Sequence, residues 1–236
     1  MAAGFNSKSD IVISASIMCA DLLNLEKEYF KLALSGIDRI HYDVMDGVFV
    51  KNIELGFSLL RALKEISQIP IECHLMTIEP EKYIDTLIKY DVEYISFHIE
   101  STKRTNYLID KIKESNRKAG IVKSPDTDIN QVLPSIKNLD FMIFMTVEPG
   151  FVGQSFKPQA LEGIKKIKRV IDDNNYKIEL GADGGLSENT IPDVLKSGVK
   201  NLILGSSSLF KVKGIYESYK RAVLNVRKIA ENCFKE

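Results

Sequence analysis

The sequence predicts an α/β fold, a single (β/α)8 TIM barrel, on the strength of three observations. Apolar runs of strand length alternate along the chain with longer segments of helical period. Eight such strand segments occur, and the 236 residues are close to the roughly 250 that a barrel of this kind uses. No stretch rich in Gly, Ser or Pro divides the chain, so residues 1–236 are expected to form one barrel domain.

The eight expected strands are short, apolar and spaced about one βα unit apart. They are Ile11–Ile17, Ile37–Val44, Ile69–Met76, Tyr94–His98, Gly120–Lys123, Phe141–Val147, Ile178–Ala182 and Val199–Leu204. Strands separated by helices pair in parallel, because a crossover helix brings the chain back to start the next strand in the same direction. Strands near both ends of the chain favour a closed ring, and an open doubly wound sheet is the alternative.

The segments between the strands carry apolar residues at helical spacing. Two examples are Ala160–Ile171 and Ile215–Ala230, in which apolar residues recur every three or four positions. Each such helix is expected to bury one apolar stripe against the barrel. The loops that follow the strands then lie on the carboxyl-terminal face, where the active sites of barrels are found.

Composition excludes several classes of partner. The chain has 32 Lys and Arg against 32 Asp and Glu, so neither nucleic acid nor a membrane is expected as a partner. No run reaches the roughly 18 apolar residues of a membrane span, and residues 1–10 include no apolar leader segment. Three irregularly spaced cysteines indicate free thiols in a reducing compartment. We therefore expect a cytoplasmic protein.

Histidines and carboxylates gather at the ends of the expected strands. The histidines are His41, His74 and His98, and each falls at or just before the carboxyl end of a strand. Residues two apart on a strand share a face, so His41, Asp43 and Met45 point to the same side. An imidazole and a carboxylate directed into the mouth of a barrel are half of a metal site.

Two further strands supply the other half of this site. His74 lies near the end of the third strand, with Met76 two residues later, and Asp183 follows the seventh. In an eight-stranded ring the second and seventh strands lie near one another across the first, so these residues are expected to converge with His41 and Asp43. Two imidazoles and two carboxylates make an N2O2 set of net charge −2, which suits Zn²⁺ best and accepts Fe²⁺, Mn²⁺ or Co²⁺.

Glycine-rich turns follow the seventh and eighth strands. Asp183-Gly-Gly ends one, and Gly205-Ser-Ser-Ser ends the other and is expected to open a short helix. Loops at these places form the usual phosphate site of a barrel, because backbone N–H groups approach an anion closely where glycine lacks a Cβ. The loop 149–158 after the sixth strand is long enough to close over a ligand. Neither a Walker A pattern nor G-x-G-x-x-G occurs, which disfavours nucleotides.

At these residues the sequence resembles the ribulose-phosphate 3-epimerase family, from Ser14 to about Phe210. Six motifs carry the resemblance in order: Ser14-Ala-Ser-Ile-Met, His41-Tyr-Asp-Val-Met-Asp-Gly-Val-Phe-Val, Cys73-His-Leu-Met, Phe97-His-Ile-Glu, Met145-Thr-Val-Glu-Pro-Gly-Phe-Val-Gly-Gln and Asp183-Gly-Gly. The resemblance implies a (β/α)8 barrel enzyme that interconverts D-ribulose 5-phosphate and D-xylulose 5-phosphate in the pentose phosphate pathway. It also implies one divalent metal ion as cofactor and a small sugar phosphate as substrate.

The resemblance assigns roles position by position. Four positions match the family's metal ligands: His41, Asp43, His74 and Asp183. Asp43 and Asp183 also match its two acid/base residues. The positions that match substrate contacts are Ser16, Met45, His74, Met76, Met145, Gly150, Phe151, Val152, Gly153, Gly184, Gly185, Gly205 and Ser206. Val152 stands where the family's lid motif usually has glycine, and a β-branched residue resists positive φ. No role is assigned to His98, which is expected to be structural.

Epimerisation beside a ketone requires one proton to leave a carbon and another to return to its opposite face. Two carboxylates flanking the substrate, one ionised and one protonated, achieve this where one fixed base fails. Three alternatives are an epimerase for another ketose phosphate such as allulose 6-phosphate, a metal-dependent hydrolase, and a non-catalytic sugar-phosphate-binding barrel. Asp43 and Asp183 disfavour the last, because binding alone needs neither base. Barrels of this kind commonly self-associate, so a homo-oligomer is expected.

Overall fold

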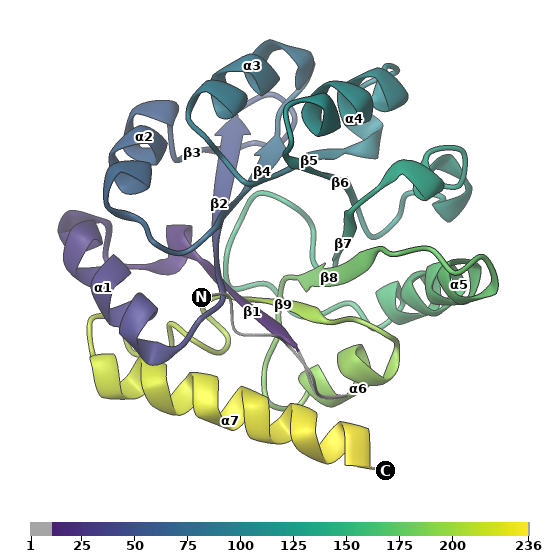
Figure 1. Cartoon of the computed structure of the whole chain (residues 1–236). Coiled ribbons are helices and arrows are strands. Elements are labelled where there is room, and N and C mark those ends of the chain that lie inside the picture. Colours follow the sequence, from purple (N-terminus) through teal and green to yellow (C-terminus); the bar gives the residue numbers. More distant parts are fainter. Residues whose placement is uncertain (1–10, 236) are drawn as a thin grey trace.

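Eight parallel strands close into a barrel in the computed structural model, which describes residues 11–235 (Figure 1). The described strands are β1 Val12–Ser16, β2 Arg39–Asp46, β3 Ile53–Glu54, β4 Ile71–Met76, β5 Tyr94–His98, β6 Lys118–Lys123, β7 Phe141–Met145, β8 Glu179–Asp183 and β9 Asn201–Leu204. The barrel order is β1-β9-β8-β7-β6-β5-β4-β2, and β1 also pairs with β2, which closes the ring. The closed (β/α)8 barrel is confirmed, and the open sheet is excluded.

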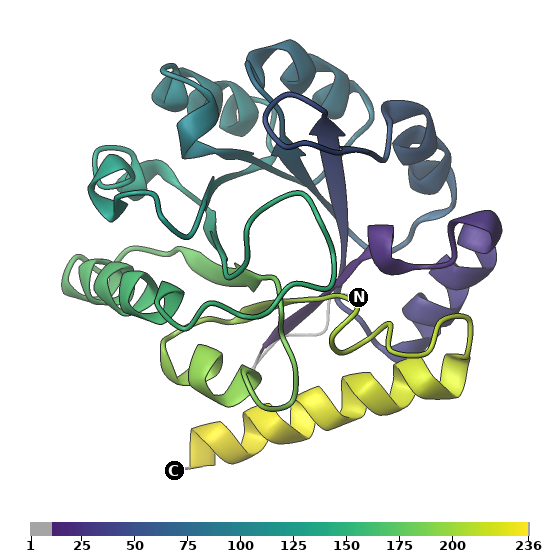
Figure 2. The ribbon, with the colours of Figure 1, turned by 180° about the vertical axis from the view of Figure 1, so that it is seen from behind.

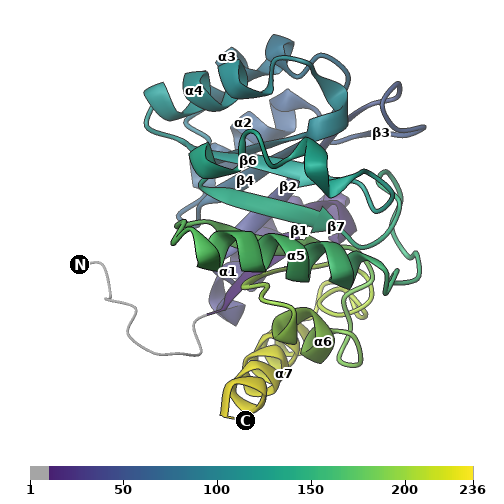
Figure 3. The same cartoon turned by 90° about the vertical axis from the view of Figure 1, so that its right-hand side faces the viewer.

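Helices surround this barrel, as Figures 1 and 2 show from its two ends and Figure 3 from the side. The described α-helices are α1 Leu25–Ser35, α2 Phe57–Ile66, α3 Glu81–Lys89, α4 Thr105–Glu114, α5 Ala160–Asp173, α6 Ile191–Lys196 and α7 Tyr216–Lys235. The two helices expected over 160–171 and 215–230 are confirmed as α5 and α7. None of these helices has both the length and the apolarity that crossing a bilayer requires.

Short 3-10 helices complete the connections. They are Ile17–Cys19, Leu22–Asn24, Ile99–Ser101, Ile129–Gln131 and Ile136–Asn138. The last two stand between β6 and β7, where the repeating pattern would place an α-helix. Pro125 and Pro134 lie in this segment, and proline lacks the N–H that a continuous helix needs.

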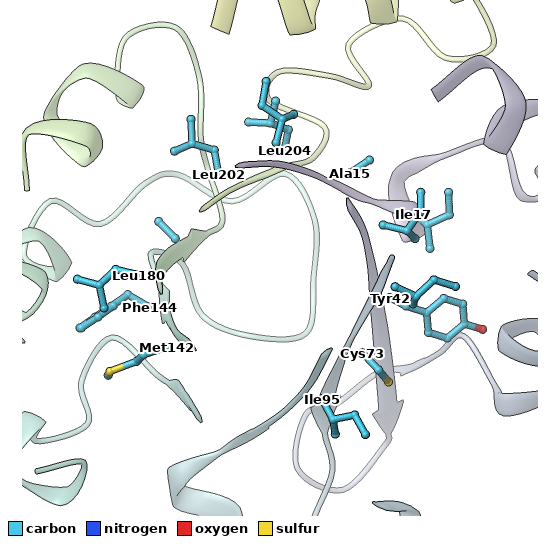
Figure 4. Close-up of a cluster of buried hydrophobic side chains, with 14 of the residues drawn as sticks. Ala15, Ile17, Tyr42, Cys73, Ile95, Met142, Phe144, Leu180, Leu202 and Leu204 are labelled. Atoms are coloured by element: carbon cyan, nitrogen blue, oxygen red, sulfur yellow. The ribbon is translucent and has the colours of Figure 1, made fainter. Parts of the chain in front are cut away.

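Strand residues alternate between two environments, as a period of two predicts. On β2, Ile40, Tyr42 and Val44 belong to the large apolar core between the strands and the helices. Figure 4 shows Tyr42 in this layer, together with Cys73 and Phe144, on the outer side of the strands. His41 and Asp43, which alternate with these residues, therefore face the inside of the barrel, and both are buried.

The barrel interior below the mouth is occupied by paired polar groups. Arg39 donates to Glu72 over 2.6 Å and to Glu179 over 2.9 Å. Asn201 donates to Glu72 over 3.0 Å and accepts a hydrogen bond of 2.7 Å from the hydroxyl of Ser14. Buried charges are tolerated where they are paired in this way. This polar layer was not expected from the sequence.

Two local expectations are wrong. The segment after β9 opens no helix: residues 206–210 form turns, in which the N–H of Ser208 donates to the carbonyl of Gly205 over 3.2 Å. The second concerns the spacing of the carboxylates, because both β1 and β9 stand between β2 and β8. Two strands therefore separate Asp43 from Asp183 on that side, where one was expected, and the two carboxylates approach each other across the mouth. The short strand β3, antiparallel to β2, was not expected either.

Candidate metal centre and active site

Four side chains from three strands meet at the carboxyl end of the barrel. They are His41 and Asp43 on β2, His74 on β4 and Asp183 on β8, and one ligand atom from each lies within 4.8 Å of all the others. The Oδ1 of Asp43 lies 3.1 Å from Nε2 of His41 and 3.2 Å from Nδ1 of His74. The Oδ2 of Asp183 lies 3.6 Å and 3.9 Å from the same two nitrogens. The expected convergence is confirmed.

Strand register brings these groups to one level. Asp43 and His74 are direct partners in the parallel pairing of β2 with β4, so their side chains leave the sheet side by side. The pairing of β7 with β8 places Asp183 opposite Met145 at the ends of their strands. The hydroxyl of Ser16, the last residue of β1, donates to Oδ2 of Asp43 over 3.0 Å. Asp43 is therefore held from both neighbouring strands.

Hydrogen-bond accounting shows that this cluster needs positive charge at its centre. The Oε1 of Glu72 lies 2.8 Å from Nδ1 of His41. Burial opposes the charged form of Glu72, but His41 and Arg39 outweigh it and lower its pKa to about 2. An ionised carboxylate only accepts, so Nδ1 of His41 carries a proton, and in a neutral imidazole Nε2 then has a lone pair. In that neutral form the lone pair would face the Asp43 oxygen 3.1 Å away, and the two acceptors would repel unless a proton on Nε2 or a metal cation lies between them.

The pKa values of the cluster point the same way. Burial opposes charge on His41, yet Asp43, Glu72 and Asp183 together raise its pKa well above the ordinary value. Burial likewise opposes charge on Asp43, but His41 and His74 hold its pKa well below the ordinary range. Burial raises the pKa of Asp183 to about 7, with Asp43 and Glu72 adding to the rise and His41 opposing it. The donor set, two imidazoles and two carboxylates, fits one divalent cation.

Two residues that support the ligands were not expected in that role. Glu72 accepts from His41, and His98 lies behind His74 with Nε2 to Nε2 at 3.0 Å. Glu72 stands two residues before His74 on the same strand, so the period of two already placed it on the inner face. His98 belongs to a motif that the resemblance matched without giving it a role. The nearby Asp46 has a structural role, because its carboxylate accepts three backbone N–H bonds.

A cleft opens above the four residues. Its lining includes every expected substrate-contact position except His74: Ser16, Met45, Met76, Met145, Gly150, Phe151, Val152, Gly153, Gly184, Gly185, Gly205 and Ser206. His74 is completely buried behind Asp43. Lining residues that were not expected are Met18, Cys19, Val147, Glu148, Gln154, Leu186, Ile203 and Ser207. Asp43 and Asp183 stand in the same lining, so the two carboxylates are open to a ligand.

The loop after β7 folds over this cleft. The side chain of Gln154 donates to the carbonyl of Glu148 over 2.6 Å and to that of Phe151 over 2.9 Å, which ties the loop to itself. Asn52 donates to the carbonyl of Gly150 over 2.9 Å and links the loop to the segment after β2. Positive φ occurs at Gly150 and Gly153 and not at Val152. The valine therefore imposes no backbone strain on the loop.

The turn after β8 depends on glycine. Gly184 has a φ of +112°, and a Cβ there would lie 2.3 Å from a side-chain carbon of Val147. Thr146 fastens the same turn, because its hydroxyl donates to the carbonyl of Asp183 over 3.0 Å. The backbone of the turn thus stays close to the cleft, as a contact between N–H groups and an anion requires.

Together, the fold and this site define a (β/α)8-barrel enzyme with a candidate metal centre at the carboxyl ends of its strands. The model of the ribulose-phosphate 3 epimerase family matches residues 12–210, and the chain belongs to this family. The ribulose-phosphate 3-epimerase of Bacillus subtilis (strain 168) is 36% identical over 198 residues, which are 84% of this chain and 91% of that protein. That of Methanocaldococcus jannaschii is 34% identical over 220 residues, 93% of this chain and 91% of that protein.

A more distant solved structure shares the fold alone. The Mycobacterium tuberculosis tryptophan synthase structure has a TM-score of 0.67 at 12% identity, and the match covers 94% of this chain and 93% of that chain. The resemblance read from the motifs is confirmed by the family match, and with it the class of enzyme, an isomerase of the epimerase type.

Proposed function

We propose that the chain is a metal-dependent epimerase that interconverts D-ribulose 5-phosphate and D-xylulose 5-phosphate at C3, in the pentose phosphate pathway. One observation carries the proposal: Asp43 and Asp183, from strands on different sides of the mouth, approach the same two imidazoles at the floor of one cleft. The names of the relatives from B. subtilis and M. jannaschii support the same reaction.

Asp43 and Asp183 are the proposed acid/base pair. One carboxylate removes the C3 proton from one face of the sugar, and the other, in its acid form, returns a proton to the opposite face. The roles exchange when the reaction runs backwards. The Ser16 hydroxyl, which donates to Asp43 over 3.0 Å, fixes that carboxylate while the substrate binds. Fixed geometry matters because a misplaced base loses the advantage of proximity.

Four residues would hold the metal ion: His41, Asp43, His74 and Asp183. Zn²⁺ suits this set best, and Fe²⁺, Mn²⁺ and Co²⁺ are compatible with it. When bound, the ion supplies positive charge that stabilises the enediolate left by proton removal. Met45, Met76 and Met145 line the cleft beside the carboxylates and offer no proton that could compete with theirs.

The glycine-containing turns would hold the substrate phosphate at the other end of the cleft. Gly184, Gly185, Gly205 and Ser206 line it after β8 and β9. The loop 150–153, which follows β7, also lines the cleft and would cover the bound sugar. The phosphate lies away from the reacting carbon, and the energy gained by binding it would hold C3 between the two carboxylates.

The test is incubation of the Zn²⁺-loaded protein with ribulose 5-phosphate in D2O, with and without a chelator. We expect xylulose 5-phosphate with deuterium at C3, and loss of both product and label when the metal is removed. Absence of C3 exchange in the loaded protein would overturn the proposal. Faster exchange with allulose 6-phosphate would favour that substrate, release of a leaving group without deuterium would favour a hydrolase, and saturable binding with no exchange would favour a non-catalytic barrel.

Two further expectations stay predictions. The homo-oligomer expected of a barrel of this kind would be measured by analytical ultracentrifugation of the full chain. The cytoplasmic location would be measured by fractionation of the source cells. Neither bears on the chemistry proposed for the cleft.

A further inference from the structure

A row of three polar side chains leads from the candidate metal centre to the edge of the barrel mouth. His98, the last residue of β5, is completely buried, and its Nε2 lies 3.0 Å from Nε2 of His74. On its other side, Nδ1 of His98 lies 3.1 Å from Oε2 of Glu100. A carboxylate is therefore connected through one imidazole to the imidazole of a candidate ligand.

The hydrogen-bond partners in this row determine which nitrogen of each histidine carries the proton. The carboxylate of Glu100 accepts from the backbone N–H of Ser124 over 2.8 Å and from the hydroxyl of Thr127. As an acceptor it also requires the proton on Nδ1 of His98. A neutral His98 then has a lone pair at Nε2, and the 3.0 Å contact requires His74 to donate from its own Nε2. The remaining nitrogen of His74, Nδ1, is left with a lone pair.

That lone pair faces the centre of the candidate metal site. Nδ1 of His74 lies 3.2 Å from Asp43 and 3.9 Å from Asp183. His41 shows the same arrangement without an intervening histidine. Its Nε2 faces the site, and its Nδ1 lies 2.8 Å from the carboxylate of Glu72. Each candidate histidine ligand is thus backed by a carboxylate, one directly and one through a second histidine.

We propose that His98 and Glu100 are positioning residues for metal binding, which hold His74 in the tautomer whose Nδ1 is free to bind the cation. The proposal rests on the metal centre proposed above and deepens it. A ligating histidine that donates its other N–H to a carboxylate or carbonyl is oriented and made more basic, and losing such a partner typically costs about 10- to 100-fold in metal affinity.

The packing of the rings supports this role. The planes of the His74 and His98 rings are only 25° apart and their centroids 5.0 Å apart, so the rings meet through their Nε2 edges. Phe49, in the segment after β2, lies over His98 with a centroid distance of 4.6 Å. Two rings therefore enclose His98, and water is excluded from its contact with His74. The alternative role for Glu100 is structural, because the same carboxylate fastens Ser124 and Thr127.

Variants at His98 separate positioning from folding. His98→Gln places an amide oxygen near the former Nε2, where it accepts from His74, whereas His98→Leu removes the acceptor. We expect His98→Leu to weaken Co²⁺ and Zn²⁺ binding about 10- to 100-fold in competition with a chelator, and His98→Gln to recover most of that loss. Glu81→Gln is the control, because Glu81 accepts from the hydroxyl of Thr102 as Glu100 accepts from that of Thr127, and it should leave the binding of both ions unchanged.

The tautomers are measured directly on the wild-type chain. Long-range ¹⁵N–¹H spectra of the Zn²⁺-loaded protein should show His98 protonated at Nδ1 and His74 protonated at Nε2, whatever happens to the variants. A proton on Nε2 of His98, or a folded His98→Leu variant with unchanged affinity for both ions, overturns the positioning role while leaving the metal centre intact. A wild-type chain that binds neither ion removes the proposed metal centre and the positioning role together.

Discussion

Asp183 is a residue whose side chain contributes to the site and little to the barrel itself. Its backbone is held by the pairing of β8 with β7 and by the N–H of Thr146, which donates to the Asp183 carbonyl over 2.7 Å. Its carboxylate, in contrast, points to His41 and His74 at 3.6 Å and 3.9 Å. A change confined to the carboxylate should therefore separate catalysis from folding.

Asp183→Asn should lower turnover of ribulose 5-phosphate by at least about 10²-fold, since general acid/base catalysis contributes about 10²- to 10⁴-fold. The fold should be unchanged by circular dichroism, because the amide keeps the size of the carboxylate. Asp173→Asn, at the end of α5 on the outside of the barrel, is the control. Substantial remaining epimerisation in Asp183→Asn would contradict the two-base scheme.

Glu72 is the residue on which the buried charges below the site converge. It accepts from Arg39 over 2.6 Å, from Asn201 over 3.0 Å and from His41 over 2.8 Å. Removing one partner from a buried, paired cluster leaves the other charge without compensation. Glu179, which also binds Arg39, is partly exposed and offers a matched comparison, with 26% of its side chain accessible against 0% for Glu72.

Glu72→Gln should lower the free energy of unfolding by about 3–5 kcal/mol, because it leaves the charge of Arg39 buried with less compensation. Glu179→Gln should cost clearly less, since water reaches that carboxylate. Urea denaturation of the two variants measures the difference. Equal losses in both variants would show that burial does not determine the effect.

At the scale of elements, the end of β2 is shaped by one carboxylate. Asp46 accepts from the backbone N–H groups of Val48, Phe49 and Ile78, each over 2.8 Å. These bonds turn the chain after β2 and join it to the segment after β4. One of these bonds, from the N–H of Phe49 to Asp46, also positions Phe49, whose ring covers His98.

Asp46→Asn should lower the free energy of unfolding by about 1–2 kcal/mol at pH 7, because its amide N–H₂ would face a backbone donor. Burial raises the pKa of Asp46, but the N–H groups of Phe49, Val48 and Ile78 outweigh it and lower the pKa. A lowered folded pKa contributes stability that is present above the unfolded value, about 3.9, and is lost as the pH falls through the folded value.

The difference in the free energy of unfolding between wild type and Asp46→Asn should therefore be largest at pH 7 and should decrease below about pH 4. Thermal unfolding of both proteins across this range provides the measurement. Asp128→Asn is the control, because Asp128 accepts from Asn130 within its own turn. A stability difference that does not change with pH would show that the charge of Asp46 does not contribute to the stability of the fold.

At the scale of the whole molecule, the metal centre joins β8 to the neighbouring strands β2 and β4, which lie far from it in the ring. β2 supplies two ligands and β4 and β8 supply one each, and β1 and β9 separate β2 from β8 on the short side. A bound cation would add a link between β8 and the pair β2 and β4 at the mouth, beyond the hydrogen bonds from Arg39 to Glu179 and from Asn52 to Gly150. Metal binding should for this reason stabilise the barrel as well as enable the reaction.

Zn²⁺ at about 100 times its Kd should raise the free energy of unfolding of the metal-free protein by about 2.7 kcal/mol. A ligand that binds only the folded state adds RT ln(1 + [L]/Kd) to this free energy. For a chain of this size we expect Tm to rise by roughly 5–10 °C. Differential scanning calorimetry with and without Zn²⁺ measures the shift. His74→Ala is the control and should show a smaller rise, and an unchanged wild-type Tm would contradict binding to the folded barrel.

Much of the candidate site could be predicted because its residues lie on strands. A period of two placed His41 and Asp43 on one face of β2, and the carboxyl ends of parallel strands meet on one side of a barrel. The loop chemistry was less predictable. Gly205-Ser-Ser-Ser forms turns instead of opening a helix, because local propensity does not determine where the chain must go to reach α7.

By itself the sequence determined the barrel, the family and the set of side chains at the mouth, because strand period, helix period and motif order are local properties of the chain. Only the tertiary structure decided which of these groups touch: that Asp43 stands beside His74, that Glu72 supports His41, and that His98 stands behind His74. Those contacts depend on strand register and on closure of the ring, which fix distances between residues that are far apart in sequence.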